Sequence, residues 1–502
     1  MPLRQALPAE LECAGTLGSG PGPERSDGSE ERVGSSGRQK PNYCSYLGRK
    51  PRGGSETFRG RAGPLRGCAS EGARRTLRRM ILPEVRTRFP VRDFDAYHQR
   101  ELPELLRAGR GAVAASDTAA IGHLAFRVPD DSGAEGASRS YTYIAEPSGI
   151  RVESGEAHAD VVVELDDEIW SGLVDDLESA PGLLYGGLCR VVRGDPMRFV
   201  RWEPRLRAIY QGRPVYTGGV GETSPAELLD RRGGPLDPTL RFELDSDPEE
   251  MAHFLRETGY LVVRSVFSAA EIAAFREDAE ALRNAAREGD QQSWWARDEG
   301  GKALLCRVID AAKRPRFAAL NQDARLLKLV SLSDHDLVAR KRNDYEAVSV
   351  LWKNPGASEG LSDLPWHRDC GMGGHAVMCP VLIATVNLTA GNAESGELRM
   401  LPGSWQNSVP FFESSDPRAP EGVGLEVEPG DVSLHYGDVM HAAPPPTASG
   451  EGPYRTSVLL AFAPRDSIPH HRGAGGYNDV LLGNEDGQVE HLAKVADRNR
   501  LD

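Results

Sequence analysis

From Tyr345 onward the chain is a succession of short segments in which apolar and polar residues alternate, separated by Gly, Pro and Asn turns. Alternation with a period of two is typical of strands with one buried face, and many short strands joined by turns indicate a β-sandwich or jelly roll. Just upstream, "FLRETGYLVVRSVFSAAEIAAFREDAEALR" predicts a helix ending at Gly259, a strand, and a second helix opened by a capping box from Ser268 to Glu271. We therefore expect a jelly roll with flanking helices in residues 241–475.

An α+β segment precedes this region, at residues 88–215. "VRDFDAYHQRELPELLRAG" predicts a helix, "HLAFRV", "SYTYIA" and "GIRVESG" predict short strands, and "ADVVVELDDEIWSGLVDDL" passes from a strand into a helix that begins near Asp166 and Asp167. The motif V-x-L-x-D-x-x-W-x-x-L, the return "LLYGGLCRVVRGDP" and a final helix follow in order. This order resembles the sterol carrier protein type of lipid-transfer domain, which implies a sterol carrier-like α+β fold.

The remaining segments have biased compositions. Residues 1–79 are rich in Gly, Ser, Pro and Arg and show no periodicity, so we predict a disordered extension. Two alternatives are a transit peptide, against which the early glutamates count, and a true start at Met80. Residues 216–240 are rich in Gly and Pro and predict a linker, and residues 476–502 form a tail.

The charge of the chain is unevenly distributed. The formal net charge is −14, but residues 1–79 carry +7, which leaves −21 for the remainder. An acidic protein repels phosphate backbones, so a nucleic-acid partner is not expected. The seven scattered Cys indicate a reducing compartment, and no apolar run approaches the ~18 residues of a membrane span. We expect a cytoplasmic protein with a small-molecule partner; the oligomeric state is left open.

The stretch "WHRDCGMGGHAVMC" concentrates potential metal ligands. One interpretation is a zinc site of His367, Cys370, His375 and Cys379. Structural zinc sites usually consist of closely paired cysteine knuckles, and these spacings do not form them. The alternative uses His367 and Asp369 alone, because residues i and i+2 of a strand point to the same face.

Two ligands do not hold a catalytic metal, so a third must come from a neighbouring strand. The stretch "GDVSLHYGDVMHAAPPP" offers His435 within a strand and His441 at the following turn. We favour His441, because a residue at a turn can face the mouth of a barrel. Two imidazoles and one carboxylate form the facial triad of non-haem Fe(II) oxygenases, which leaves coordination positions open.

A group that would hold a co-substrate follows in "YRTSVLLAFAP". Arg455 and Ser457 lie two apart on one predicted strand and therefore share a face. An Arg fork with a hydroxyl suits the distal carboxylate of 2-oxoglutarate, since guanidinium–carboxylate pairing is bidentate. Lys353, on an earlier strand, is a further candidate for contacting 2-oxoglutarate or the substrate.

These motifs together resemble the phytanoyl-CoA dioxygenase family of Fe(II)/2-oxoglutarate oxygenases. The matching stretches, in chain order, are "ETGYLVVRSVFSAAEI", "LWKNPG", "PWHRD", "ESGELRMLPGSW", "PGDVSLHYGDVMHAAP" and "YRTS". The resemblance implies a double-stranded β-helix (jelly roll) that uses Fe(II), 2-oxoglutarate and O₂. Four positions depart from the family pattern: Arg368 replaces the usual Gln, Ser395 the usual Asn before Gly396, Trp405 the usual His, and Ala443 a frequent Ser.

The sequence thus predicts a 2-oxoglutarate-dependent dioxygenase that hydroxylates an aliphatic C–H and releases succinate and CO₂. Asp369 favours hydroxylation over halogenation, because halogenating relatives replace this carboxylate with a small residue. The sterol carrier-like segment suggests a hydrophobic substrate, such as an acyl chain or a sterol-like lipid. The alternatives are a lipid-binding carrier with a degenerate oxygenase fold and a zinc-binding cupin-like protein.

Overall fold

The structure of the chain is a computed structural model. It describes residues 87–113, 121–129, 138–216, 227–342, 345–346, 348–357, 364–370, 381–410, 412, 416–447 and 455–465. All of them belong to one compact unit, residues 69–502. The predicted extension 1–79, the tail 476–502 and the zinc candidates His375 and Cys379 lie outside the described residues.

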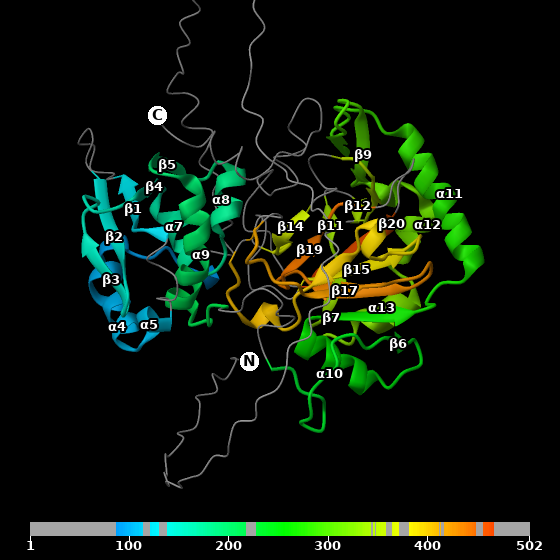
Figure 1. Ribbon diagram of the computed structural model, residues 1–502, viewed down its shortest axis with the longest axis horizontal. Helices are drawn as coiled ribbons and strands as arrows, with labels where there is room; N and C mark the ends of the chain where they lie inside the picture. Colours follow the sequence, from blue (N-terminus) through cyan, green and yellow to red (C-terminus); the bar gives the residue numbers. More distant parts are fainter. Residues whose placement is uncertain are drawn as a thin grey trace, which may run out of the picture. The chain divides into compact units, whose positions relative to one another are not determined.

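The first part of the described chain contains a five-stranded sheet of order β3-β2-β1-β4-β5 (Figure 1). Its strands are β1 (Leu124–Pro129), β2 (Ser138–Glu146), β3 (Gly149–Ser154), β4 (Val161–Glu164) and β5 (Arg190–Arg193). The β1 and β4 strands are parallel, and the other neighbours are antiparallel. The predicted meander β1-β2-β3 is therefore confirmed, and the chain crosses back to place β4 beside β1.

Within the described residues, seven short or medium helices accompany this sheet. They are α3 (Phe94–Ala96), the π-helix η1 (Tyr97–Glu101), α4 (Leu102–Arg107), α5 (Arg110–Val113), α7 (Asp167–Val174), α8 (Ala180–Gly186) and α9 (Pro196–Gln211). The sequence explains where α9 begins and ends. Asp195 accepts a hydrogen bond from the Met197 N–H, Pro196 stands in the first turn, and Gly212 ends the helix with φ 73°.

The apolar residues of this part form one core, which a few residues of the second part also enter. Phe126, Trp170 and Trp202 are fully buried in it, and so is Trp294, which lies beyond the predicted linker. The region is an α+β fold, as the sequence predicts. Its identity as a sterol carrier-like domain stays a prediction.

The second part contains a nine-stranded sheet whose main path is β6-β7-β18-β15-β20-β13-β9-β8, with β10 paired to β20. The strands are β6 (Phe242–Glu243), β7 (Tyr260–Arg264), β8 (Ser293–Arg297), β9 (Ala303–Val308), β10 (Leu337–Ala339), β13 (Val348–Lys353), β15 (Leu382–Asn387), β18 (Val432–Tyr436) and β20 (Arg455–Pro464). Neighbours far apart in sequence, such as β7 beside β18, are typical of a jelly roll.

A second sheet has the order β14-β19-β16-β17. Its strands are β14 (Leu364–His367), β16 (Leu398–Met400), β17 (Val423–Leu425) and β19 (His441–Ala443), and a separate hairpin joins β11 (Lys341–Arg342) to β12 (Tyr345–Glu346). The two sheets give a jelly-roll-like fold of mixed sheets with flanking helices, which confirms the predicted architecture of this part.

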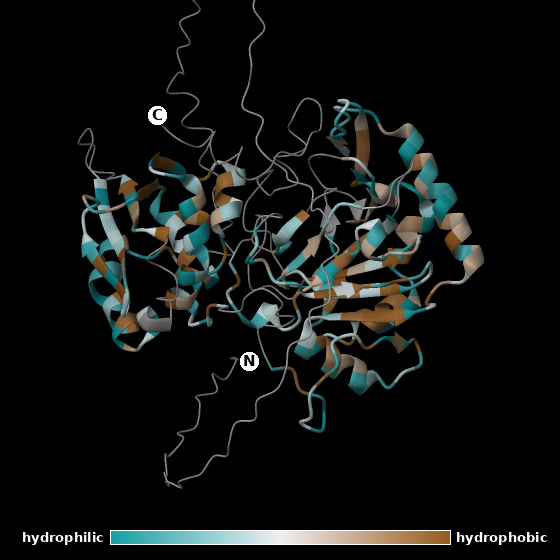
Figure 2. Cartoon of the chain, in the orientation of Figure 1, coloured by the Kyte–Doolittle hydropathy of each residue, from teal (hydrophilic) through white to brown (hydrophobic). Residues whose placement is uncertain are grey.

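Helices of the second part pack on the large sheet. They are α10 (Pro248–Thr258), α11 (Ala269–Ala285), α12 (Pro315–Leu320) and α13 (Ala324–Val330), with 3₁₀ turns η2 (Ala311–Lys313), η4 (Ala393–Ser395) and η5 (Ser404–Gln406). The predicted capping box is present, because Ser268 accepts from the Glu271 N–H and Glu271 from the Ser268 N–H. Figure 2 shows hydrophobic strands in the large sheet, while α11 alternates between hydrophobic and hydrophilic residues. Among the described residues no helix has the length and hydrophobicity that crossing a bilayer requires.

Candidate metal and co-substrate site

Two neighbouring strands of the small sheet bring the predicted ligands together. Strand β14 ends at His367 and strand β19 begins at His441. The strands are antiparallel, and these two histidines face each other in the register. Their ring centroids are 4.2 Å apart. Residues separated by 74 positions in the chain thus become direct neighbours because the jelly roll pairs their strands.

Asp369 completes the group. Its Oδ1 lies 3.8 Å from the Nε2 of His367 and 3.8 Å from the Nε2 of His441. One ligand atom from each of the three residues lies within 4.8 Å of the others. The expectation that His367 and Asp369 share one strand is wrong in detail, because β14 stops at His367. Asp369 reaches the site from the bend that follows the strand.

The backbone fixes the tautomers of both histidines. The Nδ1 of His367 lies 2.7 Å from the Pro365 carbonyl oxygen, and the Nδ1 of His441 lies 2.9 Å from that of Val439. A carbonyl only accepts, so each Nδ1 carries the hydrogen and each Nε2 presents a lone pair toward Asp369. Burial, together with the His367 ring, lowers the pKa of His441 to about 3, which keeps the ring neutral. Neutral imidazoles and a carboxylate are what a divalent metal requires.

His435 is a further histidine in this group. It lies within β18, is 3% exposed, and its ring centroid is 4.8 Å from that of His441. Its Nε2 is 3.5 Å from the Oδ2 of Asp369, the oxygen opposite to the one that faces the two ligand histidines. Desolvation raises the pKa of Asp369, but His441, His435 and His367 lower it by more, so the pKa lies well below its usual range. Within the described residues neither ring nitrogen of His435 has a hydrogen-bond partner. We therefore predict that its Nε2 orients the Asp369 carboxylate when the site is loaded, rather than replacing His441.

Replacing His435 with phenylalanine tests this role. We expect a loss of metal affinity of about 10–100-fold, which is typical when a group that orients a ligand is removed. Titration with Co(II), followed by its visible absorption, measures the change. The exposed His253, which contacts the Leu229 carbonyl, provides a matched control, His253→Phe. Equal affinities in His435→Phe and wild type would show that Asp369 needs no such support.

Arg455, the predicted co-substrate arginine, lies at the start of β20. It is 8% exposed, and its Nε has no hydrogen-bond partner in the described part of the chain. Burial lowers its pKa to about 10, although the Glu397 carboxylate raises it. A buried guanidinium whose Nε has no hydrogen-bond partner is costly, so this group is suited to receive an anionic ligand.

Lys353 and Ser457 lie close to Arg455 in the large sheet. Lys353 is fully buried and stands directly opposite Arg455 in the β13–β20 register, so the two cations share one face. The Lys353 ammonium donates to the Ala443 carbonyl oxygen, two residues beyond His441. Ser457 is buried two residues after Arg455 on β20 and therefore also shares its face. The predicted co-substrate residues are thus linked to the strand that carries His441.

The structure also accounts for two departures from the family pattern. The Trp405 indole donates to the Arg256 carbonyl (3.1 Å), and its ring packs on Tyr436 with centroids 5.6 Å apart. Arg368 lies between the two predicted ligands His367 and Asp369 in the chain. It is 8% exposed, and it contacts Glu203 of α9 and Asp438 near His441. Glu203 carried no signal in the sequence, since nothing local marks a contact with a residue 165 positions away.

The jelly-roll-like fold carries a group of two histidines and one carboxylate, which is the donor set of the facial triad in non-haem iron oxygenases. Comparison with known families supports this class. Residues 255–451 match the model of the phytanoyl-CoA dioxygenase (PhyH) family.

Solved structures that match part of this chain have low sequence identity to it. The crystal structure of AviO1 from Streptomyces viridochromogenes Tue57 is 22% identical, with 45% of this chain and 98% of that chain covered and a TM-score of 0.35. The epimerase SnoN, solved with Fe³⁺, alpha ketoglutarate and nogalamycin RO, is 20% identical over 45% of this chain and 87% of that chain, with a TM-score of 0.35. HygX from Streptomyces hygroscopicus, solved with nickel and 2-oxoglutarate, is 21% identical, with 43% of this chain and 87% of that chain covered and a TM-score of 0.33. No curated protein matches the chain.

Proposed function

We propose that this chain is an Fe(II)/2-oxoglutarate-dependent dioxygenase that hydroxylates an aliphatic C–H of a small hydrophobic substrate. The observation that carries the proposal is the meeting of His367, Asp369 and His441, with both Nε2 atoms turned toward the carboxylate. This donor set has the composition of the Fe(II) facial triad.

Each residue has a role that its surroundings support. His367, Asp369 and His441 hold the metal, and His435 orients the Asp369 carboxylate. Arg455 binds the distal carboxylate of 2-oxoglutarate, with Ser457 and Lys353 on the same face. When bound, Fe(II) with 2-oxoglutarate and O₂ supplies the oxidising chemistry that yields succinate, CO₂ and a hydroxylated product. The protein orients the reactants and shields them from water.

The substrate class rests on two features of the chain. Asp369 is retained, so no small residue leaves room for a halide, and this supports hydroxylation. The segment 88–215, which resembles a sterol carrier domain, supports a lipid, acyl or sterol-like substrate by analogy. The carrier-only alternative is less favoured, because a degenerate oxygenase would have no need to retain the triad and the buried arginine.

Turnover of 2-oxoglutarate without substrate tests the proposal. The purified full-length chain with Fe(II), 2-oxoglutarate and O₂ is expected to form succinate slowly, and His367→Ala is expected to form none above background. Under anaerobic conditions, Fe(II) and 2-oxoglutarate should produce a weak visible charge-transfer band in the wild type only. Absence of both signals would favour the carrier, and elemental analysis that finds zinc alone would favour the cupin-like alternative.

A further inference from the structure

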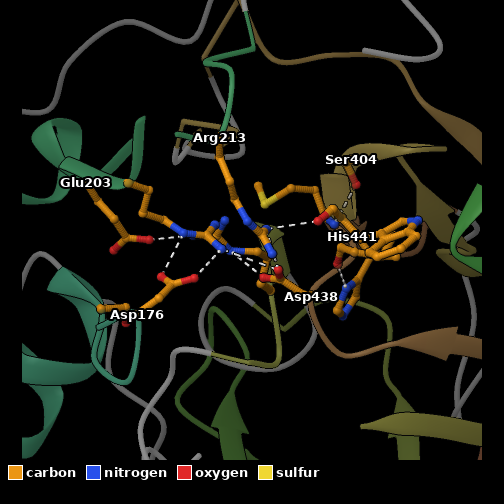
Figure 3. Close-up of polar contacts among 12 residues, drawn as sticks. Asp176, Glu203, Arg213, Ser404, Asp438 and His441 are labelled. Carbon is orange, nitrogen blue, oxygen red and sulfur yellow. Dashed lines mark hydrogen bonds and ion pairs between the residues drawn. The ribbon is translucent and has the colours of Figure 1, made fainter. Parts of the chain in front are cut away.

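A buried cluster of charged side chains joins helix α9 to the two segments that carry the metal ligands (Figure 3). All of its members are at most 8% exposed. They are Asp176, Glu203, Arg207, Arg213, Arg368 and Asp438. Three acids face three bases, so the charges in the cluster balance.

The first arm of the cluster reaches the segment of His367 and Asp369. Arg368 stands between these two ligands in the chain, and its guanidinium donates to the Glu203 carboxylate. Glu203 also accepts a hydrogen bond of 2.8 Å from the Ala180 N–H at the start of α8. The Glu203 carboxylate belongs to α9 and is also bonded to the start of α8. It therefore holds Arg368, the residue between the two ligands, in one position.

The second arm reaches the turn before His441. Asp438 lies three residues before this ligand, and its Oδ2 is 2.8 Å from Arg213 and 3.3 Å from Arg207. Arg207 is held in turn by Asp176, at 3.0 Å. Burial opposes the charge of Arg207, but Asp176 and Asp438 outweigh it and raise its pKa.

The two arms are also connected to each other. The Nε of Arg368 lies 3.5 Å from the Oδ1 of Asp438. The Cys370 N–H donates to the Gly437 carbonyl at 2.8 Å, so the backbones after β14 and after β18 are paired. Just after α9, Arg213 donates to the Trp405 carbonyl at 2.9 Å. A shift of α9 would therefore act on both ligand segments at once.

Such a cluster is costly in an apolar interior unless every charge keeps its partner. Burial raises the pKa of Glu203 to about 7, although Arg207 lowers it, and the pKa of Asp438 is likewise raised by burial. Hydrophobic packing would stabilise the contact between α9 and the ligand segments at least as well as these charges do. The cluster is better explained as a device that holds α9 and the ligand segments in one relative arrangement.

We propose that Glu203 and Arg207 of α9 are positioning residues for the metal site, acting through Arg368 on His367 and Asp369 and through Asp438 on His441. The α+β part of the chain then contributes directly to the geometry of the metal centre. This inference rests on the proposed function only in that the triad binds a divalent metal.

The test is Co(II) binding to the full-length chain, read by visible absorption rather than by activity. Glu203→Gln is expected to weaken Co(II) binding at least tenfold and to change the absorption spectrum, because Arg368 loses its counter-charge. In the double variant Glu203→Gln with Arg368→Gln, the unpaired charge is gone, and affinity should return to within about threefold of wild type. The same substitution at a partly exposed acid in the first part of the chain, Glu153→Gln, is the matched control and should change neither property.

The outcomes separate this inference from the proposed function. A wild type that binds no Co(II) contradicts the proposed function. If the wild type binds Co(II) and Glu203→Gln has the same Co(II) affinity and spectrum, the positioning role is wrong. It is also wrong if the double variant does not recover Co(II) affinity. If Glu203→Gln does not fold, Arg368→Gln is tested in its place. This variant leaves no unpaired buried charge, because Glu203 can take up a proton once its partner is lost. Unchanged Co(II) binding in folded Arg368→Gln would overturn the inference.

Discussion

Replacement of His441 by alanine is expected to lower the affinity for Fe(II) or Co(II) by more than about 100-fold, beyond the loss typical for residues that only orient a ligand. Succinate formation from 2-oxoglutarate should fall to background. His441 supplies one of three ligand atoms that lie within 4.8 Å of one another. Without it, only two protein ligands remain, and the metal dissociates more readily. The mechanism predicts the same loss for Asp369→Ala.

Thermal unfolding provides a second measurement of this effect. A metal at 100 times its dissociation constant stabilises the folded state by about 2.7 kcal/mol. We expect this stabilisation in the wild type and in His253→Ala, and none in His441→Ala. If His441→Ala kept its metal while His435→Ala lost it, the third ligand would be His435, and the assignment of the two histidines would have to be exchanged.

Replacement of Arg455 is expected to have the next largest effect. Arg455→Ala should raise the 2-oxoglutarate concentration needed for half-maximal turnover by a factor of 30 or more, since losing one partner of a buried charge pair costs about 2–5 kcal/mol. Arg455→Lys should fall between this variant and the wild type, because an ammonium keeps the charge but loses the planar fork. Co(II) binding without 2-oxoglutarate should be unchanged in both.

The same residue predicts a gain in stability. Without 2-oxoglutarate, the folded chain holds Arg455 buried with an unpartnered Nε, and burial depresses its pKa to about 10. At neutral pH the group is protonated in both the folded and the unfolded states, so the cost of burying the charge is fully present. Arg455→Met should therefore raise the free energy of unfolding by about 1–3 kcal/mol. The exposed Arg465→Met, just after the same strand, is the control; a less stable Arg455→Met would show that the charge has a partner.

The local pattern of the sequence was enough to predict much of the fold. The capping box from Ser268 to Glu271 and the strand that carries His435 follow from residues near one another in the chain. The meeting of His367 with His441 could be expected only from the order of motifs, because strand pairing in a jelly roll is non-local. The position of Asp369 beyond its strand could not be expected, since strand ends depend on tertiary pairing.

The contribution of α9 to the site had no sequence signal. A Glu in an amphipathic helix usually faces water, and Glu203 is followed by Pro204 in a helix whose other face is apolar. Only the folded chain shows that it is buried against Arg368. Similarly, the sequence offered Arg368 as a simple departure from a family motif, whereas the structure shows that this arginine has its counter-charge 165 residues away.

The chain segment that follows α9 has a consequence for how such a protein can evolve. Beyond Gly212, residues 213–216 run beside the loop that ends at Ser408, with the Tyr216 N–H bonded to the Ser408 carbonyl at 2.9 Å. This hydrogen bond joins the end of the α+β part to the part that carries the predicted metal ligands. Exchange of the α+β part alone would leave Arg368 and Asp438 buried without Glu203, Arg207 and Arg213. The acid at 203 and the base at 368 are therefore expected to change together.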